Sequence, residues 1–382
     1  MPTNRKFWCV LLLGLLLLAS SVSGQIVFGQ KTWGSPQFVY THWTVTHDDL
    51  ELTINQSHMP LTGFVPLKDN LELQFYVANS SSSLEFGDYD ISVSGLSDTR
   101  LQISQSLSDD QIVISGGMNL PTGKKKLGYS DEWAVIELLA QDFLDVPSRK
   151  YGEGLGLSAL VGIARDIGGM QVGGGISFQF NGKYEPYEEA GNYDPGDMIG
   201  INAGGELQRG PIKWSANLAY TMFTADKLED KKTLKQGSQL AVGLGVVHET
   251  ETRAIGGSLS YLIRDRNETY DSDESVLSCL KSYGNELVVN GFATLQPAAG
   301  WTVTPSASLQ KLAARESSFR IATIIEDDFG AGSILGAGCG INREITPQID
   351  AGLGFRYFTG STDGGDIDLS GYQIGLSLSA TL

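Results

Sequence analysis

The last eleven residues, Tyr372-Gln-Ile-Gly-Leu-Ser-Leu-Ser-Ala-Thr-Leu382, decide the fold class predicted for this chain. In a β-strand, successive side chains point to opposite faces. One face of this stretch is therefore apolar, and the other carries only small or polar residues. The apolar face consists of Tyr372, Ile374, Leu376, Leu378, Ala380 and Leu382. A strand of a soluble β-sandwich can show this alternation, and so can a transmembrane barrel strand with lipid outside and water inside.

The N-terminus favours the membrane alternative because it has the features of an export signal. Two basic residues precede an apolar run at residues 7–19, and small residues follow this run up to Gly24. A basic start, a short apolar core and a small-residue cleavage site are typical of a secretory signal peptide. We therefore predict a signal peptide at residues 1–24, cleaved near Gly24 and Gln25, and one exported outer-membrane β-barrel domain at residues 25–382.

Composition excludes several other classes of protein. The sequence after the signal has no run of roughly 18 apolar residues, so no membrane-spanning helix is expected there. Glycine is abundant, at 47 of 382 residues, and proline is scarce, at 12. This combination argues against a disordered chain and fits closely packed, curved strands. The formal net charge is −17 and no basic stripe is present, so we expect no nucleic-acid partner.

Strand patterns recur along the mature chain and become regular after Gly154. The interval 79–96 is rich in serine and glycine and is predicted to be a loop. The expected strands are 38–47, 50–67, 71–77, 100–107, 112–120, 155–164, 170–180, 198–208, 212–222, 239–248, 254–264, 286–296, 301–311, 333–342, 348–358 and 372–382. We count sixteen strands, or fourteen if residues 38–67 are divided differently.

The connections between these strands alternate in length. Short turns are expected at 165–169, 209–211, 249–253, 297–300 and 343–347, and long polar stretches at 182–196, 223–236, 265–284, 312–331 and 359–368. Bacterial outer-membrane barrels have short periplasmic turns and longer outer loops. The sequence therefore predicts an all-β, transmembrane, antiparallel up-and-down barrel, closed by pairing of its last strand with 38–47 or a neighbour.

One stretch, residues 130–143, has helical spacing instead of strand alternation. Ser130 is a plausible N-cap, followed by two acidic residues that suit the positive end of the helix dipole. The apolar positions are Trp133, Ile136, Leu139 and Phe143. This short helix is interpreted either as a loop helix packed on the barrel rim or as a gate folded into the pore.

Charged residues also occur on the strand faces that would line the interior. The candidate lumen residues are Glu72, Arg100, Glu206, Lys213, Arg264, Asp350 and Arg356. A lining of mixed sign favours a wet interior, because an unpaired charge in a dry one is strongly unfavourable. These residues either form ion pairs that link the strands or create a field that orients polar solutes.

Little in the sequence points to chemistry. His42, His47, His58 and His248 have no recognisable catalytic partner motif, so we do not expect an enzyme. With two mature cysteines, metal-ligand spacing is absent, and no cofactor or metal is expected. Whether Cys279 and Cys339 form a disulfide is left open.

Three phrases carry a family resemblance. They are Gly95-Leu-Ser-Asp-Thr99, Gly117-Met-Asn-Leu-Pro-Thr-Gly123 and Tyr193-Asp-Pro-Gly-Asp197. They resemble a group of bacterial outer-membrane barrels, the phenol-degradation (meta-pathway) transporters. The resemblance implies a barrel related to channels for fatty acids and aromatic hydrocarbons, and it carries no functional residue across. Such barrels usually end in Phe, whereas this chain ends in Leu382.

The predicted function is that of an outer-membrane channel for passive passage of small molecules, with hydrophobic or aromatic compounds as candidate solutes. The alternative is a structural or adhesive barrel with a filled lumen that acts through its outer loops. The expected partners are outer-membrane lipid, lipopolysaccharide, which Lys124 to Lys126 could contact, and the barrel-assembly machinery acting on the C-terminal strand. The sequence leaves open the solute, the openness of the lumen and the oligomeric state.

Overall fold

A computed structural model describes residues 31–48, 50–124, 126–128, 132–316, 319–321, 324–326 and 330–382. Three sequence predictions lie outside these residues and stay predictions. They are the signal peptide at residues 1–24 with its cleavage site, the N-cap at Ser130, and the contact of Lys125 with lipid.

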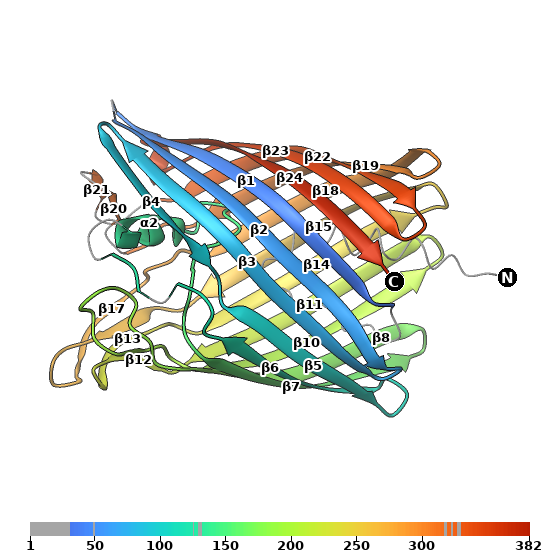
Figure 1. Cartoon of the computed structure of the whole chain (residues 1–382), viewed down its shortest axis with the longest axis horizontal. Helices are drawn as coiled ribbons and strands as arrows, with labels where there is room; N and C mark the ends of the chain where they lie inside the picture. Colours follow the sequence, from blue (N-terminus) through green and yellow to red (C-terminus); the bar gives the residue numbers. More distant parts are fainter. Residues whose placement is uncertain are drawn as a thin grey trace.

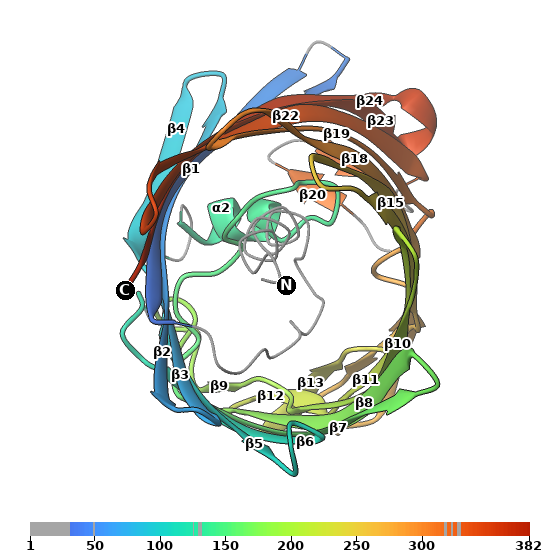
Figure 2. The same cartoon turned by 90° about the vertical axis from the view of Figure 1, so that its right-hand side faces the viewer.

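Sixteen antiparallel strands of the described chain form a closed barrel (Figures 1 and 2). Each pairs with the next, and the last pairs with the first. In order around the wall they are β1 (Trp33–His47), β2 (Leu50–Lys68), β3 (Leu71–Phe86), β5 (Thr99–Leu107), β6 (Ile112–Leu120), β7 (Gly156–Ile167), β8 (Met170–Asn181), β10 (Met198–Arg209), β11 (Ile212–Phe223), β14 (Gln239–Glu249), β15 (Arg253–Arg264), β18 (Glu286–Ala298), β19 (Trp301–Leu312), β22 (Gly332–Thr346), β23 (Ile349–Thr362) and β24 (Ile367–Thr381). The larger of the two predicted strand counts is therefore confirmed.

Closure occurs where the C-terminal strand was expected to pair. In the β1–β24 ladder, Phe38 lies opposite Leu376 and Tyr40 lies opposite Ile374. Apolar residues thus face the same side on both strands. The closing strand is longer than predicted, because it begins at Ile367.

The predicted loop at 79–96 is wrong. Its first half continues β3, and its second half is β4 (Tyr89–Leu96), which pairs with β3. β5 then pairs with Leu71 to Tyr76, the first part of β3, so β4 and β5 together act as one interrupted strand. The interruption holds one extra residue, since Leu96 pairs with Asn79 and Arg100 pairs with Tyr76.

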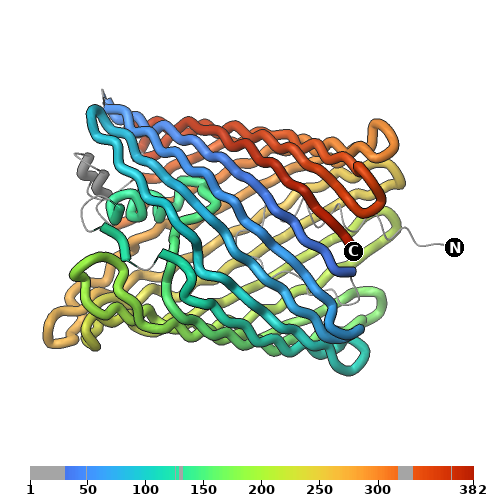
Figure 3. Tube along the Cα trace, in the orientation of Figure 1, coloured from blue at the N-terminus to red at the C-terminus, as the bar shows by residue number. Residues whose placement is uncertain are grey.

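The two ends of the barrel differ in the length of their connections (Figure 3). The end with the long connections is called the upper end, and the end with the tight turns is called the lower end. At one end the turns are tight. Gly168 and Gly169 join β7 to β8 with positive φ angles of 62° and 84°, which favour a two-residue hairpin turn. At the other end lie the long connections and three short ones. The expected long connection at 359–368 is wrong, because only residues 363–366 separate β23 from β24, and η1 (Asp363–Gly365) lies there.

The long connections contain strands that the sequence did not predict. Five of them form a second sheet in the order β17–β16–β13–β12–β9, and β20 pairs with β21. Their bounds are β9 (Tyr193–Asp194), β12 (Ala225–Leu228), β13 (Lys231–Lys235), β16 (Asn267–Tyr270), β17 (Val276–Leu280), β20 (Phe319–Ile321) and β21 (Ile324–Glu326). The connections after β8, β11 and β15 are therefore structured on their own.

The two faces of the barrel wall have opposite chemistry through most of its height. Outward apolar side chains are exposed, for example Ile163 at 63%, Ile176 at 60% and Leu353 at 50%. Their neighbours along each strand are small or polar and point inward. Within the described residues, no helix combines the length and the apolar character needed to cross a membrane.

Candidate functional site: the lumen and its internal segment

The connection between β6 and β7 spans residues 121–155, and its described residues are called the internal segment below. It contains α2 (Glu132–Leu139), which Figure 2 shows within the barrel. In Figure 1, α2 lies towards the end where the long connections gather. The helix is shorter than the predicted 130–143, and the chain turns after it through hydrogen bonds such as Leu144 N–H to the Gln141 carbonyl, 3.4 Å.

The internal segment is held first by an apolar core. Leu139, Phe143 and Leu144 are fully buried, as are Trp43 and Val45 on the inward face of β1. The remaining members of this core include Leu52, Ile54, Leu84, Val93, Val135, Leu138, Val146, Phe358, Ile367 and Leu369. Of the four predicted gate residues, two are therefore sealed against the wall. Trp133 and Ile136 are partly buried and pack on the same core.

This core reverses the usual faces of the wall. Along the lower part of β3, the outward residues Phe75 and Val77 are apolar. Further along the same face they become Ser81 and Ser83. On the inward face of the upper part, Leu84 is buried in the core. The upper part of β1 to β4 thus has a polar outer face and a mainly apolar inner face with a few buried polar residues, because the internal segment covers it from within.

Hydrogen bonds fix the internal segment to β2, β3 and β4. The Gln56 amide donates to the Ser148 carbonyl at 2.7 Å and accepts from the Ser148 N–H at 2.8 Å. The Tyr151 hydroxyl donates to the Val93 carbonyl at 3.1 Å and lies 2.9 Å from Ser82 Oγ. Burial raises the pKa of Tyr151 to about 12, so this phenol stays protonated and keeps donating at physiological pH.

A buried ionic cluster fixes the opposite side of the segment. Asp142 lies 3.7 Å from Arg264 of β15 and 3.7 Å from Arg315, and its side chain is 8% exposed. Arg264 also contacts Glu286 of β18 at 2.9 Å. Burial lowers the pKa of Arg315 from its usual value, while the Asp142 carboxylate opposes this effect. Because arginine has so high an intrinsic pKa, the group remains charged, and the cluster keeps two cations beside Asp142.

A second ion pair is open to the lumen. Arg356 of β23 contacts Asp145 at 3.0 Å, and the two side chains are 22% and 50% exposed. Of the two carboxylates of the internal segment that pair with Arg264 and Arg356 of the wall, Asp142 is therefore sealed and Asp145 is accessible.

The seven predicted lumen residues all lie on inward positions, alternating along their strands with outward apolar neighbours, but they do not form one cluster. Glu206 and Lys213 pair with each other at 2.6 Å. Arg264 and Arg356 pair with the internal segment instead, and Arg100 lies 5.7 Å from the centre of the Tyr76 ring. The two candidates that remain are the carboxylates Glu72 and Asp350. Glu72 is buried and accepts from Gln74 at 3.2 Å, and Asp350 lies opposite Ser379 of β24.

The wall of β5 to β11 contains a recess of about 260 Å³, lined by residues in the half of these strands next to the long connections. Its lining has no charged residue. Most of its side chains are small or carry a hydroxyl or an amide: Gln102, Ser115, Gly117, Ser158, Ser177, Gln179, Gly200 and Thr221. This part of the lumen therefore offers neutral hydrogen-bonding groups and little bulk.

Other candidate groups take no part in this arrangement. Cys279 and Cys339 are both exposed and unpaired in the structure. Lys124 pairs with Glu132 of α2 and Lys126 pairs with Glu185, so the contacts seen for these two lysines are intramolecular. Among the described residues, no group of three His, Cys, Asp or Glu side chains is placed to hold a metal ion.

Sequence reasoning missed the residues that anchor the internal segment: Gln56, Asp142, Asp145, Ser148 and Arg315. The only local signal was an acidic residue on each side of the apolar pair Phe143-Leu144. An acidic residue inside an apolar stretch requires a cation or a hydrogen-bond donor as its partner. The sequence could therefore have predicted that a partner exists, but not which residue it is.

The fold defines the class of the protein: a closed, sixteen-stranded antiparallel β-barrel with an internal segment. No family model and no curated protein sequence matches the chain. Among solved structures, OpdL of Pseudomonas aeruginosa is similar with a TM-score of 0.46 at 8% identity, over 92% of this chain and 99% of that one. OccK9 (OpdG) of the same organism has a TM-score of 0.46 at 10% identity, over 92% and 98%. The anion-selective porin from Comamonas acidovorans has 0.40 at 11%, over 91% and 99%. At these values the similarity carries no argument about function, which rests on the residues described above.

Proposed function

We propose that this protein is an outer-membrane channel through which small solutes pass passively. The observation that carries the proposal is the chemistry of the two faces of β7 to β15. Large apolar side chains point outward and are exposed, which suits lipid contact. The inward positions of β8 include Gly173, Gly175 and Ser177, which leave space inside.

Barrel size supports an open lumen over a filled one. Eight-stranded barrels are filled by their own side chains, whereas barrels of about 16 strands leave an aqueous channel. A filled lumen in so wide a barrel needs bulky inward residues, and the lining of the recess beside β8 is mostly glycine, serine, threonine and glutamine.

The internal segment acts in this proposal as a fixed constriction. Leu139 and Phe143 are buried against the wall, and Trp133 lies 5.0 Å from the Tyr187 ring, measured between ring centroids. The predicted gate residues therefore hold the segment in place. Movement of the segment would expose this core, so the narrowing persists during passage.

The solute class follows from the lining. Hydroxyl and amide groups along β5 to β11 favour small polar solutes. A preference for hydrophobic or aromatic compounds stays a prediction from the family resemblance, and the neutral polar recess does not favour it. The adhesive alternative has one observation in its favour, the five-stranded sheet that the long connections build.

Swelling of liposomes that contain the refolded protein tests the channel proposal. A neutral monosaccharide is expected to enter and swell them, whereas a neutral trisaccharide enters more slowly. Exclusion of both sugars, together with protein that migrates differently before and after boiling, would leave a folded but closed barrel. That result supports the adhesive alternative and ends the channel proposal.

Envelope fractionation tests the location and the partners. We expect the chain in the outer-membrane fraction, surrounded by lipid and lipopolysaccharide, with β24 recognised by the barrel-assembly machinery. Depletion of that machinery is expected to leave the chain unfolded and protease-sensitive. A folded chain in the soluble periplasmic fraction would contradict the proposal.

A further inference from the structure

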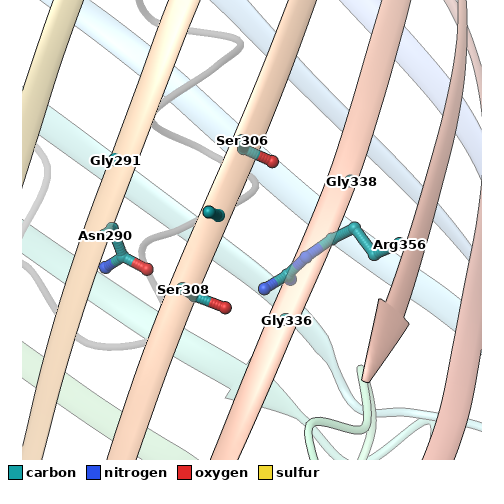
Figure 4. Close-up of a pocket in the computed structure, with 8 residues that line it drawn as sticks. Asn290, Gly291, Ser306, Ser308, Gly336, Gly338 and Arg356 are labelled. Carbon is teal, nitrogen blue, oxygen red and sulfur yellow. The ribbon is translucent and has the colours of Figure 1, made fainter. Parts of the chain in front are cut away.

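Arg356 lies flat along the inner wall, and the neighbouring glycines make this possible. A Cβ atom at Gly338 would lie 2.6 Å from Arg356 Cγ, closer than atoms can pack. In Figure 4 the side chain crosses β22 near Gly336 and directs its guanidinium towards Ser308 of β19. Because Gly336 and Gly338 of β22 have no side chains, the Arg356 side chain can extend across this strand towards β19.

The guanidinium lies 4.8 Å from the centre of the Phe358 ring, and the pocket beside it has a lining of small, neutral residues. Asn290 of β18 and Ser306 and Ser308 of β19 line it, together with glycines and one alanine. Arg356 is the only charged residue of this lining. The groups available to a ligand are thus one planar cation with several N–H donors, two hydroxyls and one amide. A guanidinium binds a carboxylate through two parallel hydrogen bonds, and neutral donors beside it can complete the shell.

A carboxylate already contacts this cation, and it comes from the internal segment. Asp145 meets Arg356 at 3.0 Å, but its side chain is 50% exposed. Ion pairs in contact with water contribute little stability and exchange readily. Asp142, only 8% exposed and placed between two arginines, continues to hold the segment if Asp145 separates from Arg356.

We infer that Arg356, with Asn290, Ser306 and Ser308, is a binding site for the carboxylate group of a passing solute, and that Asp145 occupies this site as an internal competitor. The inference rests on the proposed channel function and specifies one solute class for it. A carboxylate displaces Asp145 from the guanidinium, pairs with it in the same geometry, and leaves when Asp145 returns. The buried ion pairs of Asp142 with Arg264 and Arg315 stay intact throughout.

Two variants have opposite expected effects. Asp145→Asn removes the competitor and keeps the shape, so the affinity for a carboxylate is expected to rise by about two- to fivefold, the range for an exposed ion pair. Arg356→Gln removes the cation, and the preference for carboxylate over an uncharged analogue is expected to vanish. Arg356→Lys keeps the charge and loses the fork, so an intermediate affinity is expected. Arg343 of β22 faces outward, 4.9 Å from the centre of the Trp301 ring, so Arg343→Gln serves as the control.

The probe pair is benzoate and benzamide, which match in shape and differ in charge. Calorimetric titration of the detergent-solubilised full chain measures binding, and block of the potassium chloride current in planar bilayers measures occupancy of the pathway. We expect benzoate to bind and block at lower concentration than benzamide, and the variants to shift benzoate alone. Equal binding of both compounds, or an unchanged benzoate affinity in Asp145→Asn, would overturn the inference. A protein that conducts without this discrimination keeps the channel proposal, whereas a folded protein without conductance ends that proposal, and calorimetry still decides the site.

Discussion

Two levels of the same barrel wall show opposite arrangements of their faces. In the strands from β7 to β15, most outward residues are apolar and exposed, and most inward residues are small or polar. In the upper part of β1 to β4, the inward residues Trp43, Val45 and Leu52 are buried and the outward residues include Ser81 and Ser83. The difference shows that the polarity of each face depends on its surroundings. Where the internal segment packs against the wall, the inward residues form a hydrophobic core instead of a channel lining.

The largest expected effect comes from the core at the upper level. Phe143→Ala removes a fully buried ring from the internal segment and should reduce the stability of its docking by about 3–5 kcal/mol. Hydrogen exchange of the segment measures this loss, and Ser81→Ala on the outer face of β3 is the control. Unchanged protection in Phe143→Ala would contradict a core at this level.

An arginine placed outward at the two levels separates them directly. Ile176→Arg places a charge where lipid contact is proposed and should destabilise the barrel by about 2–4 kcal/mol. Ser81→Arg makes the same addition on the polar outer face and should change stability by no more than about 0.5 kcal/mol. Urea unfolding in lipid vesicles gives both values. Equal costs at the two positions would refute the difference in surroundings.

The polar contact between the segment and the wall is expected to matter less. Gln56→Ala leaves the buried N–H and carbonyl of Ser148 without their partner, at a cost of about 1–3 kcal/mol. The loss should appear as faster exchange of the Ser148 amide, with amides of β8 unaffected. Faster exchange throughout the barrel would mean that this contact supports the whole fold.

The smallest effect on stability, with a clear effect on passage, is expected in the recess of β5 to β11. Ser177→Phe adds a ring inside the recess lined by neutral residues and should lower conductance, while stability changes by about 0.5 kcal/mol or less. Ile176→Leu, on the outward neighbour of Ser177 that does not line the recess, is the control for the added change in β8. Normal conductance in Ser177→Phe would show that solutes do not use this part of the barrel.

The barrel itself was predictable from the sequence because outward and inward residues alternate with little exception in strands such as β8 and β24. The interval 79–96 failed because that rule assumes lipid outside. Beyond Val77 the outward residues of β3 are polar, and Ser80 to Ser83 form a serine-rich run that resembles a loop. The inward direction of Arg264 and Arg356 follows from alternation alone.

The partners of these arginines could not be predicted in the same way. Arg356 pairs with Asp145, and Arg264 pairs with Asp142, across more than a hundred residues of chain. The helix also ends at Leu139, before the predicted 143, and the chain that follows it turns so that Asp142 meets Arg264 and Arg315. Such contacts depend on how the segment enters the barrel, which no local pattern records.

The most direct test of the account is single-channel conductance of the refolded protein with and without residues 124–148. If the lumen is an aqueous path narrowed by the internal segment, both proteins conduct and the shortened one conducts more. If neither folded protein conducts, the lumen is closed by something other than the segment, and the central claim is contradicted.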